Sequence, residues 1–154
     1  MEHVIKERGE FTVIGLQIET SVQECGKVLP GLWEEFMKRE GEITAKKDAA
    51  VHYGVCKATS VEKCAFTAIA TVEVEPDCPV PEGMVKETVP AAKYAVFEHK
   101  GPASTVGETY GPMMSYMPEH GLKQAAEEIW FERYDERFKN DADSVMEIWV
   151  PILE

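Results

Sequence analysis

The stretch Ile129-Trp130-Phe131-Glu132-Arg133-Tyr134 alternates rings and charges in the manner of a β-strand. Successive side chains of a strand point to opposite faces, so Trp130, Glu132 and Tyr134 should share one face. A carboxylate flanked by two aromatic rings can hold a lipophilic cation, because the rings supply cation–π attraction and the acid supplies the counter-charge. The alternative is an ordinary surface strand with a solvated glutamate, since Glu is rarely buried without a partner.

The composition around this stretch fits one globular domain, or two small halves that share one core. Of the 154 residues, 44% are hydrophobic and 29% are charged. The net charge of -12 and the lack of a Lys/Arg run argue against direct nucleic-acid binding and mildly favour cationic ligands. There is no apolar run of about 18 residues and no signal-peptide core, so we expect no membrane association and a cytoplasmic location.

Neither the cysteines nor the histidines show the spacing of a metal or disulfide site. Cys25, Cys56, Cys64 and Cys78 are 31, 8 and 14 residues apart and form no C-x-x-C pair, so reduced thiols are expected. The four histidines are isolated, and none lies at i+3 or i+4 from another. The sequence therefore predicts no metal site and no cofactor.

The first half of the chain predicts a strand, a helix and two further strands, over residues 11–18, 22–37, 51–56 and 64–74. Capping boxes at Thr20 and Ser21 should open the helix, and Gly41 should stop it. The Pro30-Gly31 pair should kink or split this helix in its middle. The proline-rich run over residues 76–84 indicates an ordered connector between the halves.

The second half predicts the same order of elements, with strands over residues 93–99, 130–134 and 145–152 and a helix opened by a capping box at Thr105. Pro30 matches Pro112, and Gly41 matches Gly121, at an offset of about 80 residues. We therefore expect a single α+β domain over residues 1–154, a tandem pseudo-two-fold repeat of a β-α-β-β unit with halves at about 9–76 and 84–154. We expect this repeat to form antiparallel sheets and two long helices, with a ligand pocket between the halves.

The order of several short motifs resembles the GyrI-like small-molecule-binding superfamily, which includes the C-terminal effector-binding domains of AraC-type and MerR-type multidrug-responsive regulators. The motifs are Pro81-x-Gly83-Met84, Val89-Pro90-x-x-x-Tyr94-Ala95-Val96-Phe97-x-His99-x-Gly101-Pro102, Phe131-Glu132-x-Tyr134 and Glu147-Ile148-x-Val150-Pro151-Ile152. The resemblance extends from about Phe11 to Ile152. It implies an aromatic pocket between the halves with an acidic residue, here Glu132, at its floor. The family's regulators carry a helix-turn-helix upstream, whereas this chain starts almost at its first strand, so we expect no DNA-binding module in it.

Nine residues are candidates for the ligand site. They combine two acids with the aromatic residues of the strands and helices that we expect around the seam: Glu132, Trp130, Tyr134, Trp149, Tyr53, Trp33, Phe36, Tyr110 and Glu147. For Glu132 the alternative is a surface ion pair with Arg133 or Arg137. For the aromatic residues the alternative is ordinary core packing.

These observations favour a stand-alone protein that binds lipophilic cationic or aromatic small molecules, as a sensor component or a sequestering factor, and that is not an enzyme. One alternative is a small-molecule hydrolase, because some GyrI-like proteins use a pocket glutamate with a neighbouring Tyr or Trp; here Glu132 and Tyr134 would act as acid and base. Another is a protein-binding module like the family's gyrase inhibitors. The sequence leaves open the identity of the ligand, and whether the chain has a protein partner or forms a homodimer.

Overall fold

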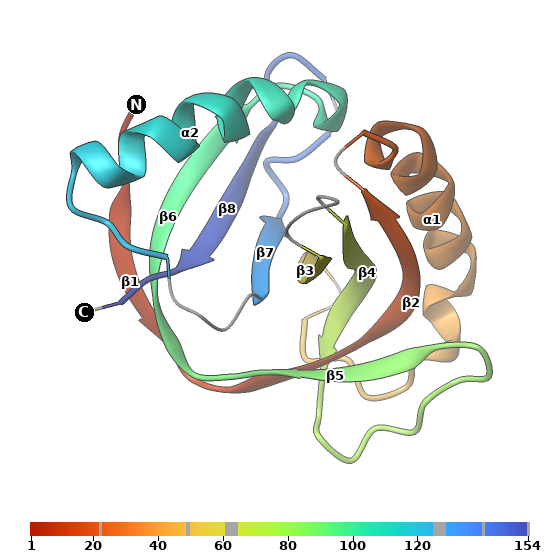
Figure 1. The fold of residues 1–154 in the computed structure, drawn as a ribbon. Helices are drawn as coiled ribbons and strands as arrows, with labels where there is room; N and C mark the ends of the chain where they lie inside the picture. Colours follow the sequence, from red (N-terminus) through yellow and green to blue (C-terminus); the bar gives the residue numbers. More distant parts are fainter. Residues whose placement is uncertain (22, 49, 61–64, 125–128, 140, 154) are drawn as a thin grey trace.

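The fold, described by a computed structural model for residues 1–154 except 22, 49, 61–64, 125–128, 140 and 154, consists of one curled antiparallel sheet and two helices (Figure 1). The strands are β1 (Val4–Arg8), β2 (Phe11–Ser21), β3 (His52–Ser60), β4 (Ala65–Val74), β5 (Val85–Val89), β6 (Ala92–Lys100), β7 (Ile129–Tyr134) and β8 (Val145–Pro151). The helices are α1 (Cys25–Arg39) and α2 (Gly107–Glu119), with single 3-10 turns at Glu40–Glu42 and Ala103–Thr105.

The eight strands lie in the order β1-β6-β8-β7-β3-β4-β2-β5, and every pairing is antiparallel. Exchanging β1 with β5, β2 with β6, β3 with β7 and β4 with β8 gives the same order read from the opposite edge of the sheet. The strands of the two halves of the chain therefore take equivalent places. The pairing of β3 with β7 joins the halves into one continuous sheet. The α+β class is therefore confirmed, while a duplication of the sequence itself stays a prediction.

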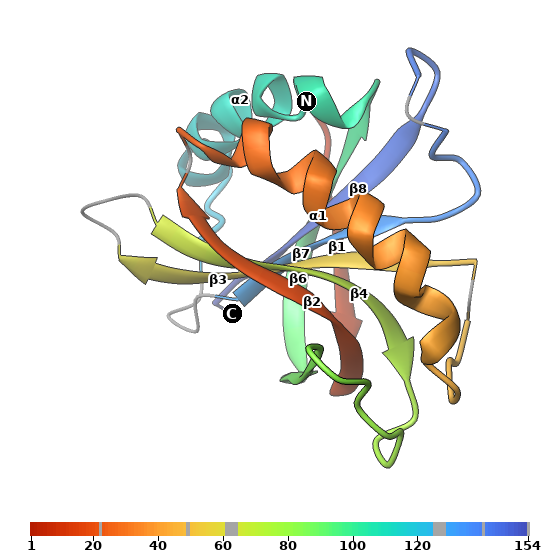
Figure 2. The same ribbon diagram turned by 90° about the vertical axis from the view of Figure 1, so that its right-hand side faces the viewer.

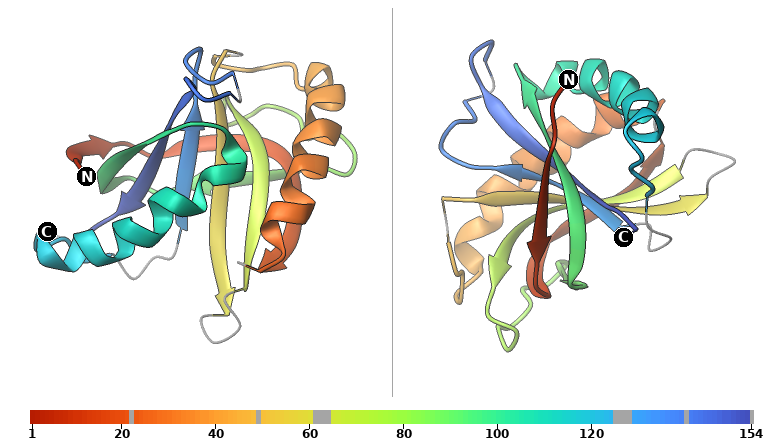
Figure 3. Two further views of the ribbon diagram at one scale, coloured as in Figure 1. Left: turned by 90° about the horizontal axis from the view of Figure 1, so that it is seen from above. Right: turned by 90° about the vertical axis from the view of Figure 1, so that its left-hand side faces the viewer.

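Both helices pack on the same face of the sheet, one over each half (Figures 2 and 3). The apolar face of α1, centred on the fully buried Phe36, packs on Ile14 of β2 and Val72 of β4. The face of α2 packs through Met113 and Met117 on β6 and β8. Neither described helix combines the length and the apolar character that a bilayer crossing requires.

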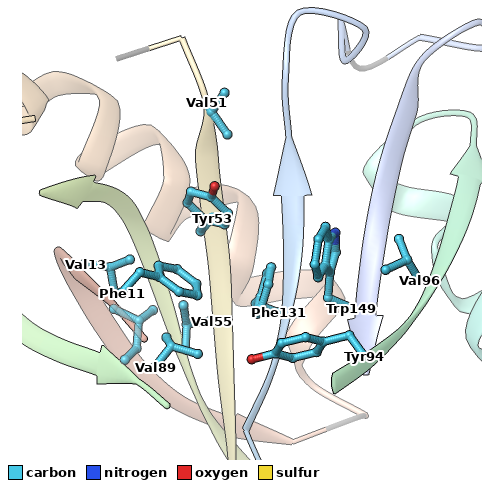
Figure 4. Packing of buried hydrophobic residues seen from close by; sticks show 11 residues of the cluster. Phe11, Val13, Val51, Tyr53, Val55, Val89, Tyr94, Val96, Phe131 and Trp149 are labelled. Carbon is cyan, nitrogen blue, oxygen red and sulfur yellow. The ribbon is translucent and has the colours of Figure 1, made fainter. Parts of the chain in front are cut away.

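The opposite face of the sheet carries a second core, in which five aromatic rings pack among aliphatic side chains (Figure 4). Its buried members are Phe11, Val13, Val51, Tyr53, Val55, Ile69, Val89, Tyr94, Val96, Phe131 and Trp149. Phe131 stacks on Trp149 with ring centroids 5.2 Å apart and meets Phe11 edge-on at 5.4 Å. Because apolar clusters cover both faces, the central strands are buried on two sides.

Several local predictions differ from the structure. The edge strands β1 and β5 were not predicted, because their half-exposed, charge-rich sequences lack the apolar runs of the inner strands. Pro30 lies inside α1 without splitting it, since packing of the Phe36 face holds the helix against the sheet. At the predicted box of Ser21, the hydroxyl oxygen accepts a hydrogen bond from the backbone N–H of Glu24 at 3.3 Å, just before α1 begins at Cys25. The box predicted at Thr105 supplies no side-chain cap to α2. Cys64, at the start of a predicted strand, lies outside the described residues.

Gly15 of β2 lies where two backbones approach closely, so Gly15→Ala is expected to destabilise the fold. A Cβ at this position would stand 1.7 Å from the carbonyl oxygen of Ala70, and backbone cannot yield as a side chain tip can. We expect a loss of about 1–3 kcal/mol in the free energy of unfolding, measured by urea denaturation.

The matched control is Gly31→Ala in α1, where nothing lies within 4 Å of the added methyl group. Alanine has the higher helix propensity, so this variant should gain up to about 1 kcal/mol. Equal effects of the two substitutions would contradict the close approach of β2 and β4.

Candidate ligand site

Glu132 lies at the centre of the sheet, on the face that the two helices cover. It belongs to β7, whose register with β3 places it directly opposite Gly54. Directly opposed residues of an antiparallel pair share a face. Because Gly54 has no side chain, the Glu132 carboxyl group occupies the space above it, with Oε1 3.5 Å from where a Cβ would stand.

Two tyrosine hydroxyl groups hold the Glu132 carboxylate. Tyr110 of α2 donates to Oε2 at 2.7 Å, and Tyr134 of β7 donates to Oε1 at 2.6 Å. Within the described part of the chain, no Lys or Arg side chain forms a salt bridge with Glu132. Among the residues that the structure describes, the Glu132 carboxyl group therefore has hydrogen-bond donors but no salt-bridge partner.

Burial shapes the protonation of this site. Glu132 keeps some exposed surface, yet enough protein surrounds its carboxyl group that desolvation raises its pKa. The hydrogen bonds from Tyr134 and Tyr110, and the nearby His99, act in the opposite direction and only partly offset the burial. Burial, followed by the charge of Glu132, raises the pKa of Tyr110 and Tyr134 well above 10.0, so both phenols stay protonated donors.

Trp33 of α1 forms the wall on the other side of Gly54. Its Cζ2 atom lies 3.5 Å from the Cβ position of Gly54, and its ring meets Tyr134 edge-on at 5.4 Å between centroids. Leu29 and Leu32 of the same helix complete this wall. Between them lies a narrow recess of about 10 Å³, enough for one water molecule.

Trp130 and Phe36 do not belong to the lining of this recess, but each lies next to a residue that does. Trp130 is on the Glu132 face, opposite Cys56 of β3, and packs on Phe66 at 5.8 Å between ring centroids. Phe36 is fully buried behind Trp33 and belongs to the core under α1. The structure thus brings together Glu132 with Tyr134, Tyr110 and Trp33, and places these two rings beside them.

Three candidate residues lie on the opposite face of the sheet, and their predicted place beside Glu132 is wrong. The register of β7 with β8 sets Trp149 opposite Phe131 and Glu147 opposite Arg133, and β3 sets Tyr53 opposite Arg133. Figure 4 shows the Tyr53 and Trp149 side chains on the same side of the strands as that of Phe131. The sequence gives the alternation within each strand but not the register between strands.

Arg133 and Arg137, the possible partners of Glu132, instead pair with acidic residues on the opposite face of the sheet. Glu147 accepts hydrogen bonds from Arg137 at 3.1 Å and from the indole N–H of Trp149 at 3.0 Å. Arg133 pairs with Asp135 at 2.8 Å and lies 3.6 Å from Glu147. The two arginines are thus engaged with other acids, and the surface ion pair considered for Glu132 is not formed.

Sequence reasoning missed the small and aliphatic residues that line the recess: Leu29, Leu32, Gly54, Cys56, Ala68 and Ala70. The spacing of Leu29, Leu32 and Trp33 on one helix face was a usable signal. Gly54 had no such signal, because its importance depends on the residue across the strand pair. Among the described residues, no group of three or more His, Cys, Asp or Glu side chains is arranged to hold a metal ion.

Comparison with known proteins matches residues 1–153 to the GyrI-like small molecule binding domain. The chain is 40% identical over 151 residues to the transcriptional regulator BrlR of Pseudomonas aeruginosa, an alignment that covers 96% of this chain. It covers 54% of BrlR, so the chain spans about half the length of the curated relative that it matches.

Two solved structures share the fold at low sequence identity. SAV2435 bound to tetraphenylphosphonium superposes with a TM-score of 0.76 at 16% identity, over 99% of this chain and 94% of that one. The C-terminal domain of EcmrR superposes with a TM-score of 0.71 at 16% identity, over 99% and 98% of the two chains. These likenesses extend over the whole sheet and both helices.

Glu132→Gln is expected to stabilise the fold increasingly as the pH rises. Because burial raises the pKa of Glu132 above the usual 4.5, the folded state binds this proton more tightly than the unfolded state does. The stabilisation from that proton is present below the unfolded pKa and is lost as the pH rises through the folded pKa. The difference in free energy of unfolding between variant and wild type, measured by urea denaturation, should therefore grow as the pH rises above the unfolded pKa and level off above the raised folded pKa.

Glu35→Gln provides the control for net charge, because Glu35 lies on the exposed side of α1. The difference in free energy of unfolding between Glu132→Gln and wild type could instead stay constant with pH, or change as it does for Glu35→Gln. Either result would show that burial does not govern the protonation of Glu132.

Proposed function

The chain belongs to the GyrI-like small-molecule-binding family, and we propose that it binds lipophilic organic cations between α1 and α2, with Glu132 as the counter-charge. The single observation that carries this proposal is the Glu132 carboxylate, which is surrounded by protein and accepts two hydrogen bonds but has no salt-bridge partner among the described residues. A buried carboxylate without a counter-ion is costly. A cation that enters the recess lowers this cost and favours the ionised form.

The rings around Glu132 suit a flat or bulky hydrophobic cation. Trp33 and Tyr134 already contact each other edge-on, and each can offer a ring face to a cation placed above Gly54. Each such contact contributes about 0.5–2 kcal/mol, and a charge-assisted pair with the carboxylate about 1.5–3 kcal/mol. With some apolar burial these terms support micromolar affinity and little selectivity, because ring faces accept many cations.

Ligand entry requires side chains to move. The recess of about 10 Å³ is far smaller than the roughly 300 Å³ or more of a pocket for a drug-sized molecule. Trp33 and Tyr110 come from different helices, so displacement of either residue, or of a helix, would enlarge the space above Gly54. SAV2435, which has the same fold, is known with tetraphenylphosphonium bound, and this supports the proposed class of ligand.

The regulatory relative supports a role for this binding in sensing. BrlR is a transcriptional regulator, and the chain corresponds to about half of it. We therefore propose that the chain reports or captures cationic compounds for a regulatory process. The raised pKa of Tyr134 keeps its phenol protonated and makes it a weak acid, so the site gives no specific support to the hydrolase alternative.

Glu132→Gln should weaken binding of tetraphenylphosphonium by about 10-fold or more, because it removes the charge-assisted contact and keeps the shape of the side chain. The measurement is tryptophan fluorescence titration at constant salt. The neutral compound triphenylphosphine oxide should bind wild type and variant alike.

Glu147→Gln is the matched control, since Glu147 carries the same charge on the opposite face of the sheet. Its affinity for tetraphenylphosphonium should stay within about twofold of wild type. Equal losses in the two variants would assign the effect to overall charge and contradict a specific role of Glu132.

Gly54→Ala should block the recess without unfolding the protein. The new methyl group would meet Glu132, Trp33 and Tyr134 at 3.5, 3.5 and 3.6 Å, which is ordinary contact. We expect a loss of tetraphenylphosphonium affinity of about 10-fold with a midpoint of urea denaturation close to wild type. Gly26→Ala, where nothing lies within 4 Å, is the control, and retained binding in Gly54→Ala would place the ligand elsewhere.

A further inference from the structure

His99 is a buried imidazole whose two ring nitrogens join β6 to the start of α2. It is 2% exposed, and it shares the helix face of the sheet with Phe97, which packs in the core under α2. Nε2 lies 3.0 Å from the carbonyl oxygen of Pro102, and Nδ1 lies 2.6 Å from the hydroxyl oxygen of Thr109. A carbonyl oxygen only accepts, so Nε2 carries a proton, and in the neutral ring Nδ1 accepts from the Thr109 hydroxyl group.

The turn between β6 and α2 brings these partners to the imidazole. Gly101 has a φ of +125°, a conformation that L side chains rarely adopt, and a Cβ there would stand 3.2 Å from the hydroxyl oxygen of Thr105. Thr105 donates to the carbonyl oxygen of Pro102 at 3.0 Å, and its own oxygen lies 3.2 Å from Nε2 of His99. One tight turn therefore holds both groups around Nε2, and the orientation of the ring leaves Nδ1 for Thr109.

The first turn of α2 is a weak piece of helix. It begins without a side-chain cap, and Gly107, Gly111 and Pro112 lower the helix propensity of this segment. The buried side chains of α2 come only after Pro112, so apolar packing does not fix the first turn. The hydrogen bond from Thr109 to His99 connects this turn to the sheet.

Tyr110, which donates to Glu132, directly follows Thr109 in the chain. The backbone N–H groups of both residues donate to the carbonyl oxygen of Val106, at 3.0 and 3.1 Å. The Thr109 hydroxyl group meets His99 on β6. The Tyr110 hydroxyl group meets Oε2 of Glu132 on β7 at 2.7 Å. The place of Tyr110 over the recess is therefore linked to the place of Thr109.

We propose that His99 is a positioning residue of the ligand site: by holding Thr109, it keeps Tyr110 on Glu132 and keeps the recess closed. The consequence for ligands rests on the proposed cation site, in which displacement of Tyr110 enlarges the space above Gly54. The bond between His99 and Thr109 then resists ligand entry, because it stabilises the closed position of the first turn of α2.

The proton affinity of Glu132 reports whether Tyr110 is in place. The hydrogen bond from Tyr110 lowers the pKa of Glu132, against the larger effect of burial, so loss of that bond should raise this pKa further. The other titratable groups that interact with Glu132 come from β7, β3, α1 and β6: Tyr134, Cys56, Cys25 and His99. Thr109 carries no charge, so its substitution changes none of these groups directly.

The experiment titrates the ¹³C-labelled glutamate carboxyl groups of the full chain by NMR without ligand, with the Glu132 signal assigned by its absence in Glu132→Gln. Tyr110→Phe sets the full effect of the hydrogen bond, and we expect it to lower the acid dissociation constant of Glu132 at least about threefold. Thr109→Val, which replaces a hydroxyl group by a methyl group, should lower this constant by a similar factor. In the Tyr110→Phe background, Thr109→Val should have no further effect.

Two matched pairs of variants isolate the hydrogen bond. Thr109→Ser keeps the hydroxyl group, so the dissociation constant of Glu132 should stay close to wild type. His99→Asn keeps an acceptor near the position of Nδ1, whereas His99→Gln keeps a donor near that of Nε2. Both remove the same imidazole, so their difference reports the bond to Thr109, and only His99→Gln should resemble Thr109→Val.

An unchanged dissociation constant of Glu132 in Thr109→Val would overturn the inference, and so would equal changes in Thr109→Val and Thr109→Ser. With tetraphenylphosphonium, Thr109→Val should associate at least about threefold faster than wild type in stopped-flow fluorescence, and an equal rate would contradict the role in ligand entry. If tetraphenylphosphonium does not bind wild type but Thr109→Val still changes Glu132, the proposed function fails and the positioning role of His99 stands.

Discussion

The pairing of β3 with β7 is the constraint on which the rest of the structure depends. It joins the two four-stranded parts of the sheet, β1-β6-β8-β7 and β3-β4-β2-β5, and sets Glu132 opposite Gly54. A side chain at position 54 would take up the space that the carboxyl group and the Trp33 ring now share. The same register sends Phe131 to the other face, where its stacking on Trp149 anchors a separate core.

The division between the two faces explains how a charge is held at the centre of the sheet. On the face away from the helices, aromatic and aliphatic side chains form a core that packs against the central strands. On the helix face, apolar cores lie over β2 and β4 and over β6 and β8, and a recess lies between them near Glu132 and Gly54. Two phenols each donate one hydrogen bond to the carboxyl group there, and these bonds partly offset the cost of burying its charge.

The sequence alone indicated the α+β class, the order of the inner elements and the central place of Glu132, because these depend on local periodicity and motif order. It did not indicate which strands are neighbours. Trp149 and Glu147 were therefore grouped with Glu132, although the register places them on the other face. Tyr110 was a candidate by its helix position, and only the structure shows its hydroxyl group on the carboxylate.

The strand order is equivalent from either edge of the sheet, but the two residues paired at its centre, Gly54 and Glu132, differ. Two glutamates facing each other there would place like charges in contact in a region of low polarity. Two glycines would leave space with nothing to attract a ligand. The near-symmetric frame thus carries unlike residues along its central strand pair, and the Gly54–Glu132 difference is what leaves both a space and a charge for the proposed ligand.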